Sequence, residues 1–190
     1  MHTDPTPIVL RRRTLLGAAL GWPLLASARV VPQPPEIIAA LPQARLQGSG
    51  RLSFLGLHVY DARLWVTEGF RVDDYGRHPL AIELQYARTL YGRLIAERSV
   101  TEMKKIGDPS PAQAQTWQAE MTRIFPDVNK GDRITGVQQP GEAARFFVNG
   151  QDRGELRDAD FVPLFFGIWL SPRSSEPKLR QALIAGGKVG

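Results

Sequence analysis

The sequence contains no cysteine, and this absence excludes several kinds of site at once. Without cysteine the chain has no disulfide framework, no thiolate-bound zinc or iron–sulfur cluster, no thiol nucleophile and no lipid anchor on cysteine. Histidine is also scarce, because only His58 and His78 lie beyond the first 28 residues, and neither has carboxylates at a spacing typical of metal ligands. We therefore expect no metal site.

Motifs of nucleophilic and nucleotide chemistry are missing as well. The chain has no G-x-S-x-G elbow, no phosphate-binding loop and no dinucleotide fingerprint, so the sequence predicts no cofactor. Its 190 residues are 43% hydrophobic and 23% charged, which is typical of a folded domain and rules out a disordered or fibrous chain. One domain with a short appendage fits this length.

The N-terminal segment has the features of an export signal. Arg11 to Arg13 precede the uncharged run 14–26, and residues 26–28 (Ala-Ser-Ala) match a signal-peptidase site. The run is shorter than the roughly 20 residues of a membrane-spanning helix. Residues 1–28 are therefore predicted to be a cleaved signal peptide, and residues 12–16 (RRTLL) fit twin-arginine export. The alternative is an internal N-terminal helix.

Export implies a periplasmic or secreted protein with no stable membrane span after cleavage. Cleavage removes three arginines and Asp4, which leaves 21 basic and 18 acidic side chains in residues 29–190. Because these charges are interspersed, we expect a mixed, solvated surface and no nucleic-acid partner.

Residues 43–190 alternate between strand and helix patterns. The proline-rich segment 29–42 is predicted to be an extended lead-in. Period-two alternation, helical spacing and end signals then predict these elements: strands 46–55, 57–66 and 80–88, helices near 95–106 and 111–125, strands 132–138, 143–148 and 151–156, a helix over 161–170, and a last helix that starts at Ser174 or Ser175 and includes Leu179 and Leu183. The order predicts an α+β fold, and Gly48 and Gly50 leave room for a close neighbour.

Several polar side chains lie on otherwise apolar strands. Arg51, Tyr60 and Tyr86 are the candidate ligand-binding residues, with Arg63 and Trp65 nearby, because an arginine and a tyrosine in an apolar cleft fix the acidic end of a ligand. The alternative is that the arginines are solvated or paired with an acid and that the tyrosines fill the core. Asp61 and Arg63 share a strand face and are placed to pair.

Four spaced motifs carry a family resemblance. They are 46–66 (LQGSGRLSFLGLHVYDARLWV), 96–99 (AERS), 125–132 (FPDVNKGD) and 167–172 (GIWLSP), followed by a basic helix. In this order they resemble the chalcone isomerase-like proteins of bacteria. The resemblance implies an open-faced β-sandwich, in which helices pack on one face of a large antiparallel sheet.

The same resemblance implies one of two functions, catalysis or the binding of a ligand. Family enzymes close a flavanone ring with an arginine, a threonine and a tyrosine, whereas non-catalytic members bind fatty acids through an arginine and a tyrosine. Tyr60 stands at the threonine position and Arg51 lies in the segment of the arginine, which is similar to the fatty-acid-binding pattern. The remaining catalytic positions fall near the apolar residues Leu94, Leu164 and Phe165.

Three hypotheses follow. The first is an exported, non-catalytic domain that binds a small apolar or amphipathic acid, such as a fatty acid. The second is an isomerase or intramolecular lyase in which Arg51 polarises a carbonyl and Tyr60 or Tyr91 positions a proton. The third is a structural or partner-binding envelope protein that uses the apolar 161–170 segment as an interface.

Overall fold

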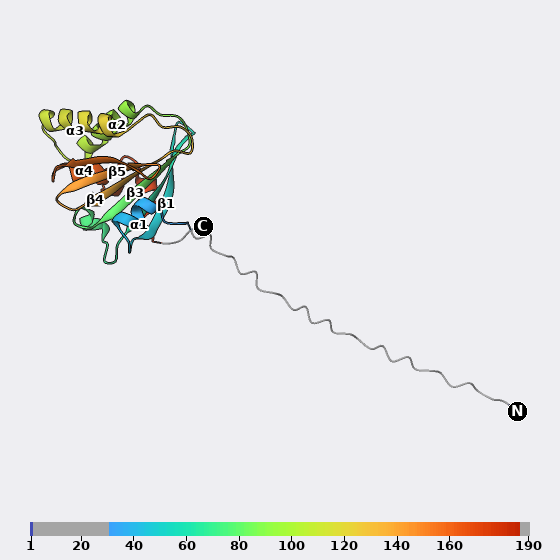
Figure 1. The fold of residues 1–190 in the computed structure, drawn as a ribbon. Helices are drawn as coiled ribbons and strands as arrows, with labels where there is room; N and C mark the ends of the chain where they lie inside the picture. Colours follow the sequence, from blue (N-terminus) through green and yellow to red (C-terminus); the bar gives the residue numbers. More distant parts are fainter. Residues whose placement is uncertain (2–30, 187–190) are drawn as a thin grey trace.

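The computed structural model describes residues 31–186, together with Met1 (Figure 1). The expected signal peptide and its twin-arginine segment lie outside the described residues. The elements are α1 (Pro35–Ala40), β1 (Arg45–Phe54), β2 (Leu57–Val66), the 3-10 helix η1 (Val72–Arg77), β3 (Leu80–Tyr86), α2 (Gly92–Ile106), α3 (Pro111–Ile124), β4 (Arg133–Gln139), β5 (Ala143–Val148), β6 (Gln151–Arg157), α4 (Phe161–Leu170) and α5 (Pro177–Ile184).

The six strands form one antiparallel sheet in chain order, each strand paired with the next. Two-residue turns close two of the hairpins, at Leu55-Gly56 between β1 and β2 and at Asn149-Gly150 between β5 and β6. All four of these residues have positive φ angles. The predicted α+β fold with an antiparallel sheet and packed helices is confirmed.

Helices α2 to α5 cover one face of the sheet and enclose the main core (Figure 1). Alternate residues of β2, namely Ala62, Leu64 and Val66, point into this core, as period-two alternation predicts. The expected capping box of α3 is present: the Ser110 side chain accepts from the Gln113 amide, and the Gln113 side chain accepts from the Ser110 amide. The buried stripe of α3 is the predicted one, Ala114, Trp117, Met121 and Ile124.

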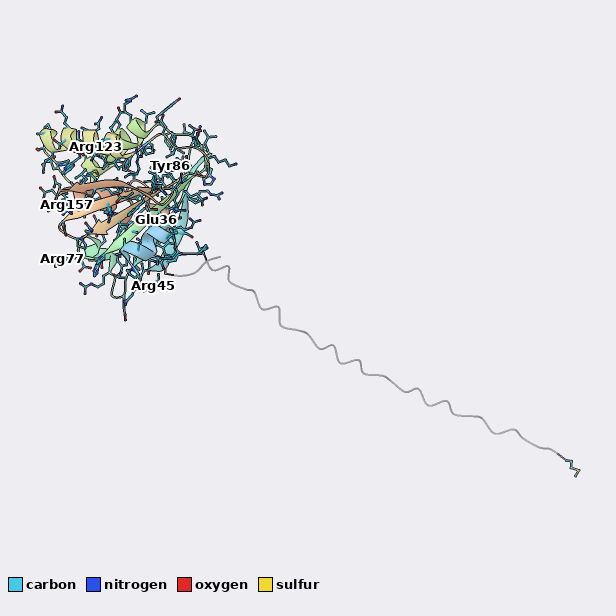
Figure 2. The ribbon with its side chains drawn as sticks, in the orientation of Figure 1. Glu36, Arg45, Arg77, Tyr86, Arg123 and Arg157 are labelled. Carbon is cyan, nitrogen blue, oxygen red and sulfur yellow. The ribbon has the colours of Figure 1, made fainter. Side chains whose placement is uncertain are left out.

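The opposite face of the sheet carries α1, and here the sequence prediction was wrong. We expected residues 29–42 to be extended, but Pro35–Ala40 is helical, because Pro35 occupies the first turn, where its missing N–H costs nothing. Ile37 of this helix packs into a second core beside Trp65. Glu36, labelled in Figure 2, is buried and receives a two-pronged hydrogen bond from Arg133.

Gly48 and Gly50 of β1 lie under α5, as their small size predicts. A Cβ at Gly48 would stand 2.4 Å from the carbonyl oxygens of Ala182 and Leu183. Helix α5 therefore lies directly on the backbone of β1, and this close approach forms one wall of the space between sheet and helices.

Candidate functional site

A cavity of about 330 Å³ lies between the sheet and helices α2, α4 and α5. Its volume is at the lower end of the range of about 300–1,000 Å³ for small-molecule sites. The apolar lining comprises Leu52, Phe54, Val59, Leu84, Leu90, Leu94, Ile95, Phe125, Ile134, Phe165, Ile168, Trp169 and Leu179. The polar lining comprises Tyr60, Tyr86, Arg88, Arg98, Ser99, Glu102, Ser175 and Glu176.

A break in the strand register shapes the sheet side of the cavity. Leu52 pairs with Tyr60 but the next residue of β1, Ser53, pairs with His58, so Val59 is an extra residue on β2. Such bulges bend a strand and redirect its side chains. Val59 and Tyr60 consequently both line the cavity although they are consecutive in the sequence.

Two buried tyrosines meet on the sheet wall. The rings of Tyr60 and Tyr86 stand edge to face with centroids 5.9 Å apart, and Trp169 Nε1 donates a hydrogen bond to the Tyr60 hydroxyl at 3.1 Å. Burial raises the pKa of both phenols, so both remain protonated at neutral pH. Among the described residues neither phenol has a protein acceptor for its own proton. These two protons are available to an acceptor atom of a ligand.

The helix wall carries a charged network centred on the buried carboxylate of Glu102. Arg98 and Lys105 contact Glu102 Oε1 at 2.7 and 3.0 Å, and the Ser175 hydroxyl donates to Oε2 at 2.6 Å. Burial disfavours the charged form of Glu102, but these partners outweigh burial and its pKa is lowered. Glu102 is therefore ionised, and Arg98 and Lys105 balance its negative charge. The ion pair holds Arg98 at the cavity.

Arg51 lies on the face of the sheet away from the cavity, which corrects its placement beside Tyr60. Its side chain is 62% exposed and its Nε donates to Asp61 Oδ1 at 3.0 Å. The alternative interpretation, a surface arginine paired with Asp61, describes it. The expected pair of Asp61 with Arg63 is also absent, because Arg63 contacts Glu83 at 2.8 Å.

Tyr60 and Tyr86 do line the cavity, and Trp65 does not, since it packs under α1 and donates to Glu83. Sequence reasoning missed Arg98 and Glu102. Their separation by four residues in a helix was the available signal, because it places an arginine and a glutamate on one face.

The helix α4 is unavailable as an interface, which argues against the third hypothesis. Seven of its ten residues are buried, including Phe161, Phe165 and Phe166. Across residues 31–186 no helix has both the length and the apolar character needed to cross a bilayer.

The isomerase hypothesis requires Arg51 and Tyr60 or Tyr91 at the site, but Arg51 does not line the cavity. Tyr91 also lies outside the cavity lining, with 62% of its surface exposed.

The chain belongs to the chalcone isomerase-like family, whose model matches residues 31–185. It is 28% identical to an uncharacterized protein of Haemophilus influenzae over 150 residues, which are 77% of this chain and 71% of that protein. Its structure is similar to that of AtFAP1, a fatty-acid binding protein of Arabidopsis thaliana, with a TM-score of 0.58. That match has 15% sequence identity and covers 75% of this chain and 87% of the plant chain.

Proposed function

We propose that the cavity binds a small apolar or fatty-acid-like ligand without transforming it. The observation that carries this proposal is a cavity wall of thirteen apolar side chains with two protonated phenols on one side. Apolar surface of this kind favours a hydrocarbon, and a few fixed donors orient its polar end. The structural similarity to a plant fatty-acid binding protein supports the same ligand class.

The polar end of the ligand lies against Tyr60 in this proposal. Trp169 already donates to the Tyr60 oxygen, so the phenol proton points to another acceptor, and a ligand oxygen accepts it. Arg98 stands on the facing helix and favours a negatively charged head group. The ligand is thus an amphipathic acid, with its chain among the side chains of β1, β3 and α4.

Titration of the protein with three twelve-carbon probes tests this assignment. The probes are dodecanoic acid, dodecanol and dodecylamine, which share a chain and differ in the head group. We expect the acid to bind most tightly and the amine least, because Tyr60 donates a hydrogen bond and Arg98 is cationic. Equal affinity for the three probes would show that the head group is not recognised. If none of the three probes binds, the proposal is refuted.

We also propose that the protein is exported to the periplasm or secreted. Support comes from residues 11–28, which combine three arginines, an uncharged run and a small-residue cleavage site. Expression of the full chain in a Gram-negative host, followed by fractionation and N-terminal sequencing, tests this. We expect a periplasmic product that begins at Arg29; an uncleaved cytoplasmic chain would contradict export.

A further inference from the structure

Exposed apolar side chains gather at one end of the folded domain. Among residues 31–186, six large hydrophobic side chains are exposed, and five of them lie at the β1–β2 turn or at the start of α2. These five are Phe54, Leu55, Leu57, Tyr91 and Leu94, and they are called the apolar rim below. Figure 1 shows the β1–β2 turn at the far end of β1 from α1.

The turn itself is built from an unfavourable residue. Leu55 and Gly56 have φ angles of 49° and 76°, nearly the same as the 50° and 81° of Asn149 and Gly150 in the β5–β6 turn. Asn-Gly is the pair that suits this geometry, whereas leucine rarely adopts a positive φ. Leu55 is 85% exposed, so packing within the domain does not compensate for this strain.

The apolar rim is continuous with the cavity. Phe54 and Leu94 line the cavity, yet they are also 57% and 44% exposed. A backbone hydrogen bond of 2.9 Å from Ala87 to Val59 holds the β1–β2 hairpin beside the segment that leads into α2. The apolar wall of the cavity therefore reaches the molecular surface between these two segments.

The same end is rich in arginine. Segments 51–61 and 87–102 contain four arginines and three acidic residues, and Arg51 is paired with Asp61 on the other face of the sheet. Arg93 and Arg98 are paired with Glu97 and Glu102, whereas Arg88 lines the cavity, is exposed and has no ion-pair partner in the described part of the chain. An exposed arginine beside apolar side chains complements an anionic head group above a hydrocarbon layer.

We propose that the apolar rim inserts into the surface of a lipid bilayer that contains anionic phospholipid. Leu55 and Phe54 enter the boundary between head groups and acyl chains, Tyr91 lies at head-group level, and Arg88 faces a phosphate. A lipid surface suits a projecting turn, because it receives isolated apolar side chains without a matching groove. Docking places the cavity mouth against the membrane, so that a ligand can exchange between the cavity and the bilayer. This ligand exchange rests on the proposed function, whereas docking itself does not.

A single fluorescent probe tests the docking in the full-length protein. Since the chain has no cysteine, Leu55→Cys carries an environment-sensitive dye at one position only. Arg77→Cys, whose exposed side chain lies at the other end of the domain (Figure 2), is the matched control. With vesicles of phosphatidylcholine and phosphatidylglycerol in equal parts, we expect a blue shift and protection from iodide at position 55 and neither at position 77.

A second variant separates docking from folding. Leu55→Asn installs the residue found in the β5–β6 turn, so we expect unchanged or higher thermal stability. Vesicle binding of this variant is measured with a dye at Leu57→Cys. Leu55→Asn should weaken vesicle binding roughly tenfold, since one leucine no longer enters the bilayer. Dodecanoic acid titrated without vesicles should bind this variant as tightly as it binds the parent.

Three results would overturn the proposal. The dye at position 55 could remain in water with these vesicles, which would refute docking even if another part of the chain bound them. A blue shift that grows with protein concentration and needs no vesicles would indicate a second copy of this chain. An unchanged vesicle affinity of Leu55→Asn would show that the apolar rim does not insert. None of these results depends on whether the cavity binds dodecanoic acid.

Discussion

The indole Nε1 of Trp169 donates a hydrogen bond to the hydroxyl of Tyr60 at 3.1 Å and so ties α4 to β2 inside the cavity. This contact determines which hydrogen bond Tyr60 has left to offer. The oxygen of Tyr60 is used by the protein, and its proton is available to a ligand. The hydrogen bond thus holds α4 against β2 and leaves the Tyr60 hydroxyl as a donor toward the cavity.

Removal of the Tyr60 hydroxyl should affect both stability and binding. In Tyr60→Phe the buried Trp169 N–H loses its acceptor, so we expect a loss of about 1–3 kcal/mol in the free energy of unfolding. Dodecanoic acid should bind about tenfold more weakly by titration calorimetry. Tyr75→Phe is the control, because that hydroxyl donates to Pro163 O at 2.9 Å away from the cavity lining. It should lose stability and keep its affinity; equal losses of affinity would contradict the role of Tyr60.

Gly48→Ala should destabilise the domain by about 2 kcal/mol or more, because the added methyl group meets the backbone of α5. The carbonyl oxygens of Ala182 and Leu183 would lie 2.4 Å from it, and a helix backbone moves less readily than a side chain. Urea denaturation measures the change. Ser49→Ala, an exposed neighbour on the other face, should change stability by less than about 0.5 kcal/mol. Similar values for the two variants would refute the close contact.

Glu36→Ala should lower the free energy of unfolding by about 3 kcal/mol, since it removes the buried acceptor of Arg133 and Thr135. Glu142→Ala, which breaks the exposed pair with Arg157, should cost less than about 1 kcal/mol. Chemical denaturation of both variants provides the comparison. A small effect at position 36 would mean that α1 contributes little to the domain.

Acidification should weaken the link between α2 and the start of α5. The pKa of Glu102 is lowered in the folded protein, so its stabilisation is complete above the ordinary carboxyl pKa of 4.5 and is lost as the pH falls through the lower folded value. Glu102→Gln should therefore be less stable than the parent at neutral pH. The gap in melting temperature should narrow below a pH of about 4. A gap independent of pH would contradict an ionised Glu102.

Most of the fold was predictable because its elements follow simple periods. The strands alternate every second residue, and α3 combines a capping box with a four-residue stripe. Helix α1 was not predictable from periodicity, since its six residues, which begin with the third of three closely spaced prolines, make less than two turns. Only the sheet face beneath it, with Trp65 and Arg133, makes Pro35–Ala40 a stable helix.

The candidate site was predicted in part. Tyr60 and Tyr86 face the cavity because their strands alternate as expected. Arg51 was predicted to lie there as a polar residue on an otherwise apolar strand and by family resemblance, although the alternation of residues 46–54 puts it on the face opposite Leu52. The four-residue spacing of Arg98 and Glu102 indicates that they share a face of α2, but only tertiary packing brings that face to the cavity.

The adjacent residues Arg51 and Leu52 provide the most direct test of a ligand-binding cavity. Leu52→Trp fills the cavity from β1, whereas Arg51→Ala removes a side chain on the other face. Titration of each variant with dodecanoic acid, after circular dichroism has established that both are folded, compares the two faces. The cavity account predicts that Leu52→Trp abolishes binding and that Arg51→Ala binds as the parent does. Binding that survives Leu52→Trp or disappears in Arg51→Ala would contradict it.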